Sequence, residues 1–266
     1  MNCDPSNPKG AGSAGVVDIW QESFPVRFGA VDKSDRLTLD TIFNYFQEAA
    51  ICHADNIGVG REDMSGQAWI LSRMSVLVNR RPNYRENIII RTWPRGFEKL
   101  FAIRNYQIKD KDGVPVVSAR SAWLIVDIEK RRPLRPQSLP AELPLNEGLD
   151  ALTPEDKGAA ALAERNDLIK AAERKALYSD LDFNGHVNNI RYINWIEDSI
   201  EPRLLENADK MRLDINYISE ILSGEVIELY SSDDEKNISE SRAFAFEGRK
   251  KEGGQTAFRA ELKLRA

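Results

Sequence analysis

Residues 180–198 concentrate polar side chains of the kinds that perform acid–base chemistry. Asp182, Asn184 and His186 alternate along this segment, and a helix with an apolar stripe follows directly. In an extended segment, side chains at positions i, i+2 and i+4 point to the same side. The chain has only two histidines, and one of them stands here. Burying these polar groups together is costly unless they are paired or used, so we interpret the segment as an active site.

A structural interpretation competes with this one. Asp182 and Asn184 can form an Asx-turn that caps the following helix. The other histidine, His53, stands beside Cys52, but neighbouring positions on a helix point apart. A structural role is therefore favoured for His53, and no Cys–His catalytic pair is expected.

The composition excludes several classes of protein. A chain with 42% hydrophobic and 30% charged residues is typical of a globular protein. The net charge of -5 opposes general nucleic-acid binding. Two cysteines and two separated histidines do not make a metal site, so no metal or cofactor is expected. The chain has no apolar run of the about 18 residues that a membrane span needs, and we expect a cytoplasmic protein without a membrane partner.

The chain contains two copies of one pattern, in which an apolar-striped helix is followed by several short strands. The expected helices are 34–56 and 187–200. The expected strands are 69–78, 87–93, 101–109 and 115–126 in the first copy, and 211–217, 225–231, 241–249 and 255–264 in the second.

Sequence echoes support the repeat. Residues 73–78 match 212–217, and residues 85–89 match 224–228. A helix that is apolar on one face, followed by a meander of strands, predicts an α+β unit in which an antiparallel sheet wraps around a central helix. The expected organisation is a flexible tail at 1–19, a first unit at 20–131, a linker at 132–166 and a second unit at 167–266.

At this point the residues resemble a known family. The string Asp-x-Asn-x-His-Val-Asn-Asn, followed by Tyr192 and Trp195, is similar to the motif of the acyl-acyl-carrier-protein (acyl-ACP) thioesterases, whose fold is a tandem hot-dog. Further similar segments lie at 24–28, 44–50, 69–74 and 121–123. The resemblance implies hydrolysis of a fatty acyl thioester to free fatty acid and holo-ACP, which terminates fatty acid synthesis, with acyl-ACP as the partner.

In this family the second half carries the chemistry and the first half shapes the acyl pocket. We align Asp35 with Asp182 and Tyr45 with Tyr192, which also pairs residues further along the motif. The resulting pairs are Leu37 with Asn184 and Leu39 with His186. The first copy then has apolar residues where the second has its polar cluster, so we expect one catalytic site per chain.

The resemblance also implies an acidic residue on the strand after the catalytic helix, and Glu220 fits that position, with Arg81 as its counterpart in the first copy. Many plant relatives have cysteine directly after this residue, whereas this chain has Ile221. The departure excludes a cysteine nucleophile there and favours attack by water. We expect His186 and Glu220 to share the role of general base, Asn184 to orient water or substrate, Asp182 to fix the loop, and N–H groups at the helix start to bind the oxyanion.

Two binding surfaces follow from the same resemblance. An acyl chain needs an apolar slot, and the candidates for its wall are Phe43, Phe46, Ile70 and Met74, although each is equally typical of ordinary core. Acyl carrier proteins are acidic, so a basic docking patch is expected. The candidates for it are Arg131, Arg132 and Arg135, with Arg80 and Arg81 as further members.

Alternative functions stay open at this level. Hot-dog enzymes also act on acyl-coenzyme A, and a non-catalytic acyl-ACP-binding protein would share the same pocket. A hydratase on this fold needs a different layout of His and acid. Pairing of two units within one chain can already satisfy hot-dog dimerisation, so a homodimer of the whole chain is undecided.

Overall fold

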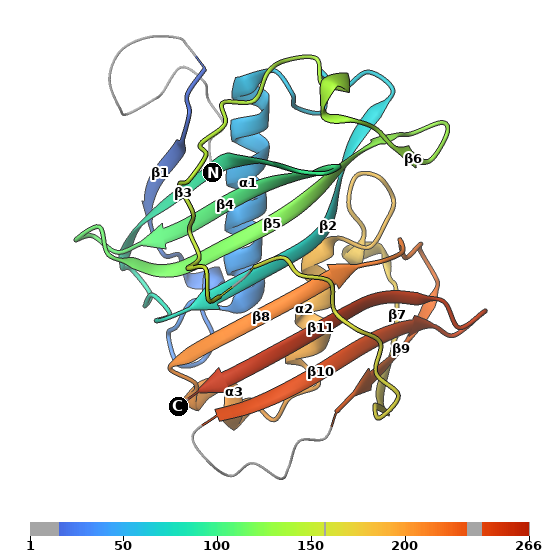
Figure 1. Cartoon of the computed structure of the whole chain (residues 1–266). Coiled ribbons are helices and arrows are strands. Elements are labelled where there is room, and N and C mark those ends of the chain that lie inside the picture. The colour runs from blue at the N-terminus through green and yellow to red at the C-terminus, as the bar shows by residue number, and fades with distance from the viewer. Residues whose placement is uncertain (1–15, 157, 233–240, 266) are drawn as a thin grey trace.

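The computed structural model describes residues 16–156, 158–232 and 241–265, and it has two similar halves built on one continuous sheet (Figure 1). The α+β fold class, with an antiparallel sheet around one main helix in each half, is confirmed. The first 15 residues of the expected tail lie outside the described residues. Val17, by contrast, is anchored to the first helix, because its N–H donates to Asn56 at 3.0 Å and its carbonyl is 2.8 Å from a ring nitrogen of His53.

The first half begins with a strand that the sequence pattern did not reveal. Its elements are β1 (Trp20–Pro25), α1 (Leu39–Ile57), β2 (Gln67–Val78), β3 (Asn87–Glu98), β4 (Phe101–Lys109), β5 (Pro115–Asp127) and the short β6 (Arg132–Pro133). The apolar stripe of α1 is buried against the sheet, which confirms the predicted helix. The helix ends at Gly58, whose φ of 81° is the left-handed conformation that glycine adopts without strain.

The second half repeats this order. Its elements are β7 (Ile169–Lys175), α2 (Asn189–Glu197), α3 (Pro202–Asn207), β8 (Lys210–Tyr217), β9 (Val226–Ser231), β10 (Ser241–Lys250) and β11 (Thr256–Arg265). The expectation that each copy begins with its helix is wrong, because β1 and β7 precede α1 and α2. These strands alternate buried or half-buried with exposed positions, but they are short and carry charged residues, so their apolar signal is weak.

The described strands form one 11-stranded sheet whose order reverses at its centre. The path runs β1-β3-β4-β5-β2-β8-β11-β10-β9-β7, with β6 added beside β5. The halves join where β2 pairs antiparallel with β8, from Arg73 opposite Asn216 to Val78 opposite Met211. We call this pairing the seam. Both α1 and α2 lie on the same side of the sheet, behind the strands as viewed in Figure 1. None of the described helices has the length and apolar character needed to span a bilayer.

The segment between the halves crosses the other side of the sheet at the seam (Figure 1). Leu162 donates its backbone N–H to Asn216 Oδ1 at 2.8 Å, and the Asn216 amide donates back to the Ala160 carbonyl at 2.9 Å. The Ala159 N–H donates to Ser75 Oγ at 2.6 Å. This segment therefore packs as a strap over β2 and β8, while the boundaries at 132 and 166 stay predictions.

The two helices meet beneath the seam, where α2 presents the carboxyl group of Glu197 to the start of α1. Burial raises the pKa of Glu197 to about 8, and the negative charge of Asp40 acts in the same direction. A hydrogen bond from the Leu39 backbone opposes this increase. Glu197 is therefore largely protonated at neutral pH in the folded protein.

This partly buried carboxyl makes the free energy of unfolding depend on pH. The folded pKa of about 8 lies above the ordinary value of 4.5, so the folded state holds a proton that the unfolded state releases between these values. The free energy of unfolding should therefore fall as pH rises through this window. Glu197→Gln cannot titrate, so its free energy of unfolding should increase relative to the wild type over the same window. Urea unfolding at a series of pH values measures this difference. Glu201→Gln, at an exposed position, controls for loss of one carboxylate, and an equal response of both variants would contradict the assignment.

Candidate active site

The segment before α2 is a tight loop organised by the Asp182 carboxylate. Asp182 Oδ1 accepts hydrogen bonds from the backbone N–H of Asn184 at 2.8 Å and of His186 at 3.2 Å. The N–H of Asp182 donates to the His186 carbonyl at 2.7 Å. Gly185 permits the turn with a left-handed φ of 77°. Because these residues form a turn and not an extended strand, the alternation expected from the sequence does not apply, and Asp182 reaches His186 through the backbone.

The first unit contains the same loop. Asp32 Oδ1 accepts hydrogen bonds from the N–H of Ser34 at 2.8 Å and of Arg36 at 3.2 Å. Asp32 also donates its own N–H to the Arg36 carbonyl at 2.9 Å. The aspartate therefore has the same structural role in both units, whereas the histidine occurs only in the loop of the second unit.

The repeated loop corrects the register expected from the sequence. The residues expected opposite Asp182, Asn184 and His186 were Asp35, Leu37 and Leu39; the observed ones are Asp32, Ser34 and Arg36. The alignment of Tyr45 with Tyr192 is wrong for the same reason, because α1 and α2 both start three residues after the last of these positions. The counterpart of the polar cluster is therefore polar and basic, and not apolar.

A second comparison of the units supports Arg81 as the counterpart of Glu220. His186 forms an isolated β-bridge with Leu222, and Arg36 forms the equivalent bridge with Asn83. The Arg81 guanidinium is buried and donates to Asp32 at 2.6 Å and to the Leu205 carbonyl at 3.0 Å. In the first unit, an ion pair and the chain around α3 therefore occupy the space that corresponds to the catalytic candidates.

His186 and Glu220 come together in the second unit. His186 Nε2 lies 3.5 Å from Glu220 Oε2, with 36% and 39% of the two side chains exposed. The His186–Leu222 bridge holds the loop beside the chain that follows β8. Glu220 itself lies in this connection, three residues beyond the end of β8, and not in the strand. The pair is accessible to solvent, and the two groups lie within ion-pair distance of each other.

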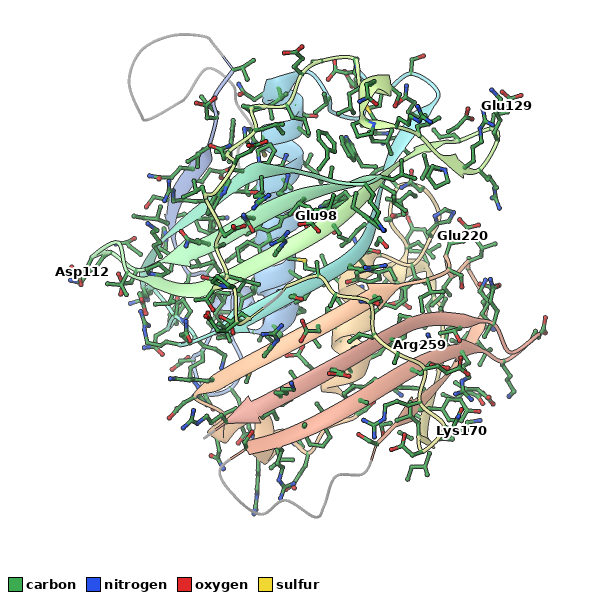
Figure 2. The ribbon with its side chains drawn as sticks, in the orientation of Figure 1. Glu98, Asp112, Glu129, Lys170, Glu220 and Arg259 are labelled. Atoms are coloured by element: carbon green, nitrogen blue, oxygen red, sulfur yellow. The ribbon has the colours of Figure 1, made fainter. Side chains whose placement is uncertain are left out.

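Residues of the first unit also contact the candidate site around Glu220. Arg131 Nη2 lies 3.4 Å from Glu220 Oε1, on the opposite oxygen from the histidine. In Figure 2, Glu129, from the same β5–β6 turn as Arg131, lies on the same side of the molecule as Glu220. The Arg61 guanidinium stacks over the Phe183 ring, with its carbon 4.1 Å from the ring centroid. Arg131 and Arg61 of the first unit therefore contact the loops of the second unit that carry Glu220 and Phe183.

The start of α2 has an unused hydrogen-bond donor. The Asn188 side chain caps the helix by accepting from the Ile190 N–H at 3.0 Å, and the Asn188 N–H donates to the Asp180 carbonyl at 2.8 Å. The Arg191 N–H donates to the Asn188 carbonyl at 2.9 Å. The N–H groups of Asn188, Ile190 and Arg191 all donate hydrogen bonds. The N–H of Asn189 has no hydrogen-bond partner among the described residues. The helix start therefore combines a capping side chain, Asn188, with the free N–H donor of Asn189, as the expected donor site requires.

A small, narrow cavity lies beside this helix start. Its lining residues are Phe43, Gln47, Leu71, Met74, Tyr106, Trp123, Asn189 and Ile190. Most of them belong to the first unit, whereas the last two belong to α2. The cavity thus lies between the start of α2 and the space between α1 and its sheet.

The expected acyl-pocket residues have different surroundings. Phe43 and Met74 line the small cavity. Phe46 is fully buried, with its ring centroid 4.9 Å from that of Tyr106. Ile70 is 47% exposed and lines neither of the two cavities described here. The strand period alone did not reveal this, because β2 carries a bulge between residues 71 and 73 that shifts the following side chains relative to β5.

A larger cavity, open to solvent, lies further along α1. Trp123 lines both cavities and stands between them. Leu143, from the expected linker, closes part of the wall. Sequence reasoning missed Gln47, whose side-chain amide has no hydrogen-bond partner among the described residues although it faces the small cavity. Its signal was a single polar residue on the apolar side of the first helix.

The surroundings of the site are buried and aromatic. Tyr192, on the first turns of α2, packs edge-on against Tyr217 and Phe258, with ring centroids 5.4 Å and 5.0 Å away. Burial raises the pKa of Tyr192, and the carboxylates of Asp182, Glu225 and Glu220 add to the increase. The phenol therefore stays neutral and contributes packing below the loop.

Comparison with known proteins agrees with this geometry. Residues 17–140 match the model of the acyl-ACP thioesterase N-terminal domain, and residues 164–265 match that of the C-terminal domain. The chain belongs to the acyl-ACP thioesterase family. It is 27% identical to a palmitoyl-acyl carrier protein thioesterase of Cuphea hookeriana, with 94% of this chain aligned to 63% of that protein. The match to the hydrolase FATB1 of Cuphea viscosissima, also at 27% identity, covers 79% of this chain and 53% of that protein. The chain therefore spans less than two thirds of the length of these relatives.

Solved structures of family members show the same fold. An acyl-ACP thioesterase from Bacteroides thetaiotaomicron superposes with a TM-score of 0.79 at 26% identity, covering 92% of this chain and 97% of that one. A 12:0-ACP thioesterase from Umbellularia californica superposes with a TM-score of 0.75 at 19% identity, covering 93% and 94%. The tandem hot-dog architecture of the family is thus the architecture of this chain.

The repeated loop provides a matched test of Asp182. Asp182→Ala leaves the N–H groups of Asn184 and His186 without their carboxylate acceptor, which should lower the free energy of unfolding by about 1–3 kcal/mol. Asp32→Ala removes the equivalent acceptor in the first unit and should also destabilise. Only Asp182→Ala should alter the reactivity of His186 toward diethyl pyrocarbonate, measured by mass spectrometry below the unfolding transition. The same change of reactivity in both variants would show that the loop does not position the imidazole.

Proposed function

We propose that this protein is an acyl-ACP thioesterase that hydrolyses a fatty acyl thioester to free fatty acid and holo-ACP. The observation that carries the proposal is the 3.5 Å approach of His186 to Glu220 in the loop just before α2, whose first residue, Asn189, lines a cavity built largely by the first unit. A base close to an apolar cavity is the arrangement that hydrolysis of a long acyl thioester requires. Membership of the family supports the same activity.

The reaction proceeds by attack of water on the thioester carbonyl. His186 or Glu220 takes a proton as the water oxygen bonds to the carbonyl carbon, and the carbon–sulfur bond then breaks. The proton passes to the leaving thiolate. Arg131, on the other oxygen of Glu220, orients the carboxylate toward the imidazole. Ile221 is fully buried and brings no nucleophile, which supports water as the attacking group.

The oxyanion of the tetrahedral intermediate needs hydrogen-bond donors in fixed positions. The free N–H of Asn189 is such a donor, at the positive end of the α2 dipole. The Gln47 amide faces the same cavity from α1. A thioester carbonyl held between these groups would direct its acyl chain past Phe43 and Met74 into the first unit. Each buried methylene contributes about 0.8 kcal/mol, so the depth of the cavity sets the preferred chain length.

The first test asks whether His186 and Glu220 act in catalysis or only stabilise the fold. His186→Ala, and separately Glu220→Gln, should lower kcat for acyl-ACP by about 100-fold to 10,000-fold, because each removes a proton acceptor. Arg36→Ala changes the residue that corresponds to His186 in the first unit, so its kcat should remain that of the wild type. Thiol release from a panel of acyl-ACPs measures the rates, and thermal unfolding checks the fold. Wild-type turnover by His186→Ala would exclude the mechanism. Tight acyl-ACP binding without thiol release by the wild type would identify a binding protein instead.

The basic docking patch for the acidic carrier divides into two parts. Arg131 is paired with Glu220, whereas Arg132 and Arg135 are exposed and make no ion pair with another described residue. Arg80 and Arg81 are paired with Glu86 and Asp32 and are not free for a carrier. Arg132 and Arg135 are therefore the residues that we assign to carrier docking.

Carrier docking is tested by charge reversal that spares the catalytic pair. Arg132→Glu together with Arg135→Glu should raise KM for acyl-ACP by about tenfold or more, because two attractive contacts become repulsive. The kcat should stay unchanged. The same variant assayed with the matching acyl-coenzyme A is the control, since that carrier lacks the acidic protein surface. An equal KM effect on both carriers, or none on either, would remove these arginines from carrier recognition.

A further inference from the structure

The larger cavity holds a charged side chain in an otherwise apolar setting. Its wall includes Ala50, Ala54, Ile103 and Trp123, and the one ionisable residue in its lining is Arg104 on β4. Strand pairing puts Arg104 opposite Ser121 of β5 and Pro94 of β3. Pro94 lines the same cavity. A slot that served only alkyl chains would be expected to end in apolar side chains.

Arg104 is held in place by neutral groups. Its Nη1 donates to His53 Nδ1 at 3.1 Å and to Thr92 Oγ1 at 3.3 Å. The other ring nitrogen of His53 lies 2.8 Å from the Val17 carbonyl and must donate to it, which leaves Nδ1 as an acceptor. Burial and the neighbouring Arg104 lower the pKa of His53 to about 3. The histidine is therefore neutral and orients the guanidinium without balancing its charge.

No carboxylate of the described residues pairs with Arg104. The contrast with Arg81 is informative, because that buried guanidinium lies 2.6 Å from the Asp32 carboxylate. Arginine stays protonated in proteins, so the cavity carries a positive charge that the described chain leaves unbalanced. Arg104 is half-buried, and withdrawing a charge from water without a partner is costly. The guanidinium has further N–H groups beyond Nη1, and these are available to a ligand.

Other polar groups of the same region are already satisfied. The Tyr106 hydroxyl lies 3.1 Å from Ser121 Oγ, and the Trp123 indole donates to the same Ser121 oxygen at 2.7 Å. Ser121 is fully buried. These hydrogen bonds fix the orientation of the Trp123 indole, which lines both cavities. An acyl chain that extends past Trp123 into the larger cavity therefore meets the charged group of Arg104.

We propose that the larger cavity receives the far end of an acyl chain that bears a carboxylate, which pairs with Arg104. The preferred substrates would be ω-carboxyacyl thioesters, and the product would be a dicarboxylic acid. This inference rests on the proposed function, since it assigns the acyl class of the same site. A planar carboxylate matches the fork of a guanidinium and can accept two hydrogen bonds.

The test compares matched pairs of acyl-ACPs with equal carbon number, one plain and one ω-carboxylated, over a range of chain lengths with the full chain. At the best length, kcat/KM should favour the ω-carboxylated member by about tenfold or more, the worth of a charge-assisted hydrogen bond. Arg104→Met should abolish or reverse this preference, and Arg104→Lys should retain part of it. Arg95→Met is the control, because Arg95 follows Pro94 on β3 but pairs with Asp150 at 3.3 Å and does not line the cavity.

Calorimetric binding of free acids separates this inference from the proposed function. The dicarboxylic acid should bind more tightly than the monocarboxylic acid of equal length, and Arg104→Met should remove the difference even if no thioester is hydrolysed. Absence of all hydrolysis would refute the proposed function and leave this result intact. A preference for plain acyl chains that Arg104→Met does not change would overturn the inference. Arg104-dependent binding of monocarboxylic acids as tight as that of dicarboxylic acids would also overturn it, because the carboxylate would then be the head of a fatty acid.

Discussion

The pairing of β2 with β8 is the interaction on which the rest of this structure depends. Six residue pairs, from Arg73 with Asn216 to Val78 with Met211, merge two sheets into one. Because the pairing is antiparallel and central, α1 and α2 come to the same face and the start of α2 meets the side of α1. The strap across the outer face fixes the seam through the amide of Asn216. Neither half alone would contain the cavity that Phe43 and Met74 line together with Asn189 and Ile190.

The duplication explains why the chain has one site and not two. Each unit keeps the aspartate-centred loop before its helix, since Asp32 and Asp182 satisfy equivalent N–H groups. The units diverge at the two candidate catalytic positions. His186 and Glu220 face each other in the second unit, whereas Arg36 and Arg81 replace them in the first. Arg81 turns to Asp32 and fills the space, so under the proposed function the first unit supplies walls and the second supplies the base.

Charge is distributed between the units in a way that composition does not reveal. The whole chain is acidic, yet arginines of the first unit reach the Glu220 carboxylate, stack on Phe183 and enter the larger cavity. Conversely, the half-buried Glu197 of α2 lies against the start of α1, where its pKa rises. Charged side chains of both units therefore contribute to the junction, whereas Arg104 lies in a cavity lined by the first unit and by Leu143 of the linker.

The sequence by itself determined the elements and the two-unit plan. Apolar stripes with the period of a helix gave α1 and α2, and the echo between residues 73–78 and 212–217 predicted the two strands that form the seam. The motif also identified His186 and, through the family resemblance, Glu220. The sequence pattern did not reveal β1 and β7. It also gave the wrong register for the loop, because Tyr45 and Tyr192 of the two helices matched by chance. The hydrogen bonds that define the register of the loop are not visible in the sequence. Only the tertiary structure decided that Ile70 is exposed, that Arg131 reaches Glu220, and that Arg104 lies unpaired in a cavity. Such contacts join residues far apart in the chain, and their geometry follows from the bulge in β2 and the seam, neither of which periodicity records.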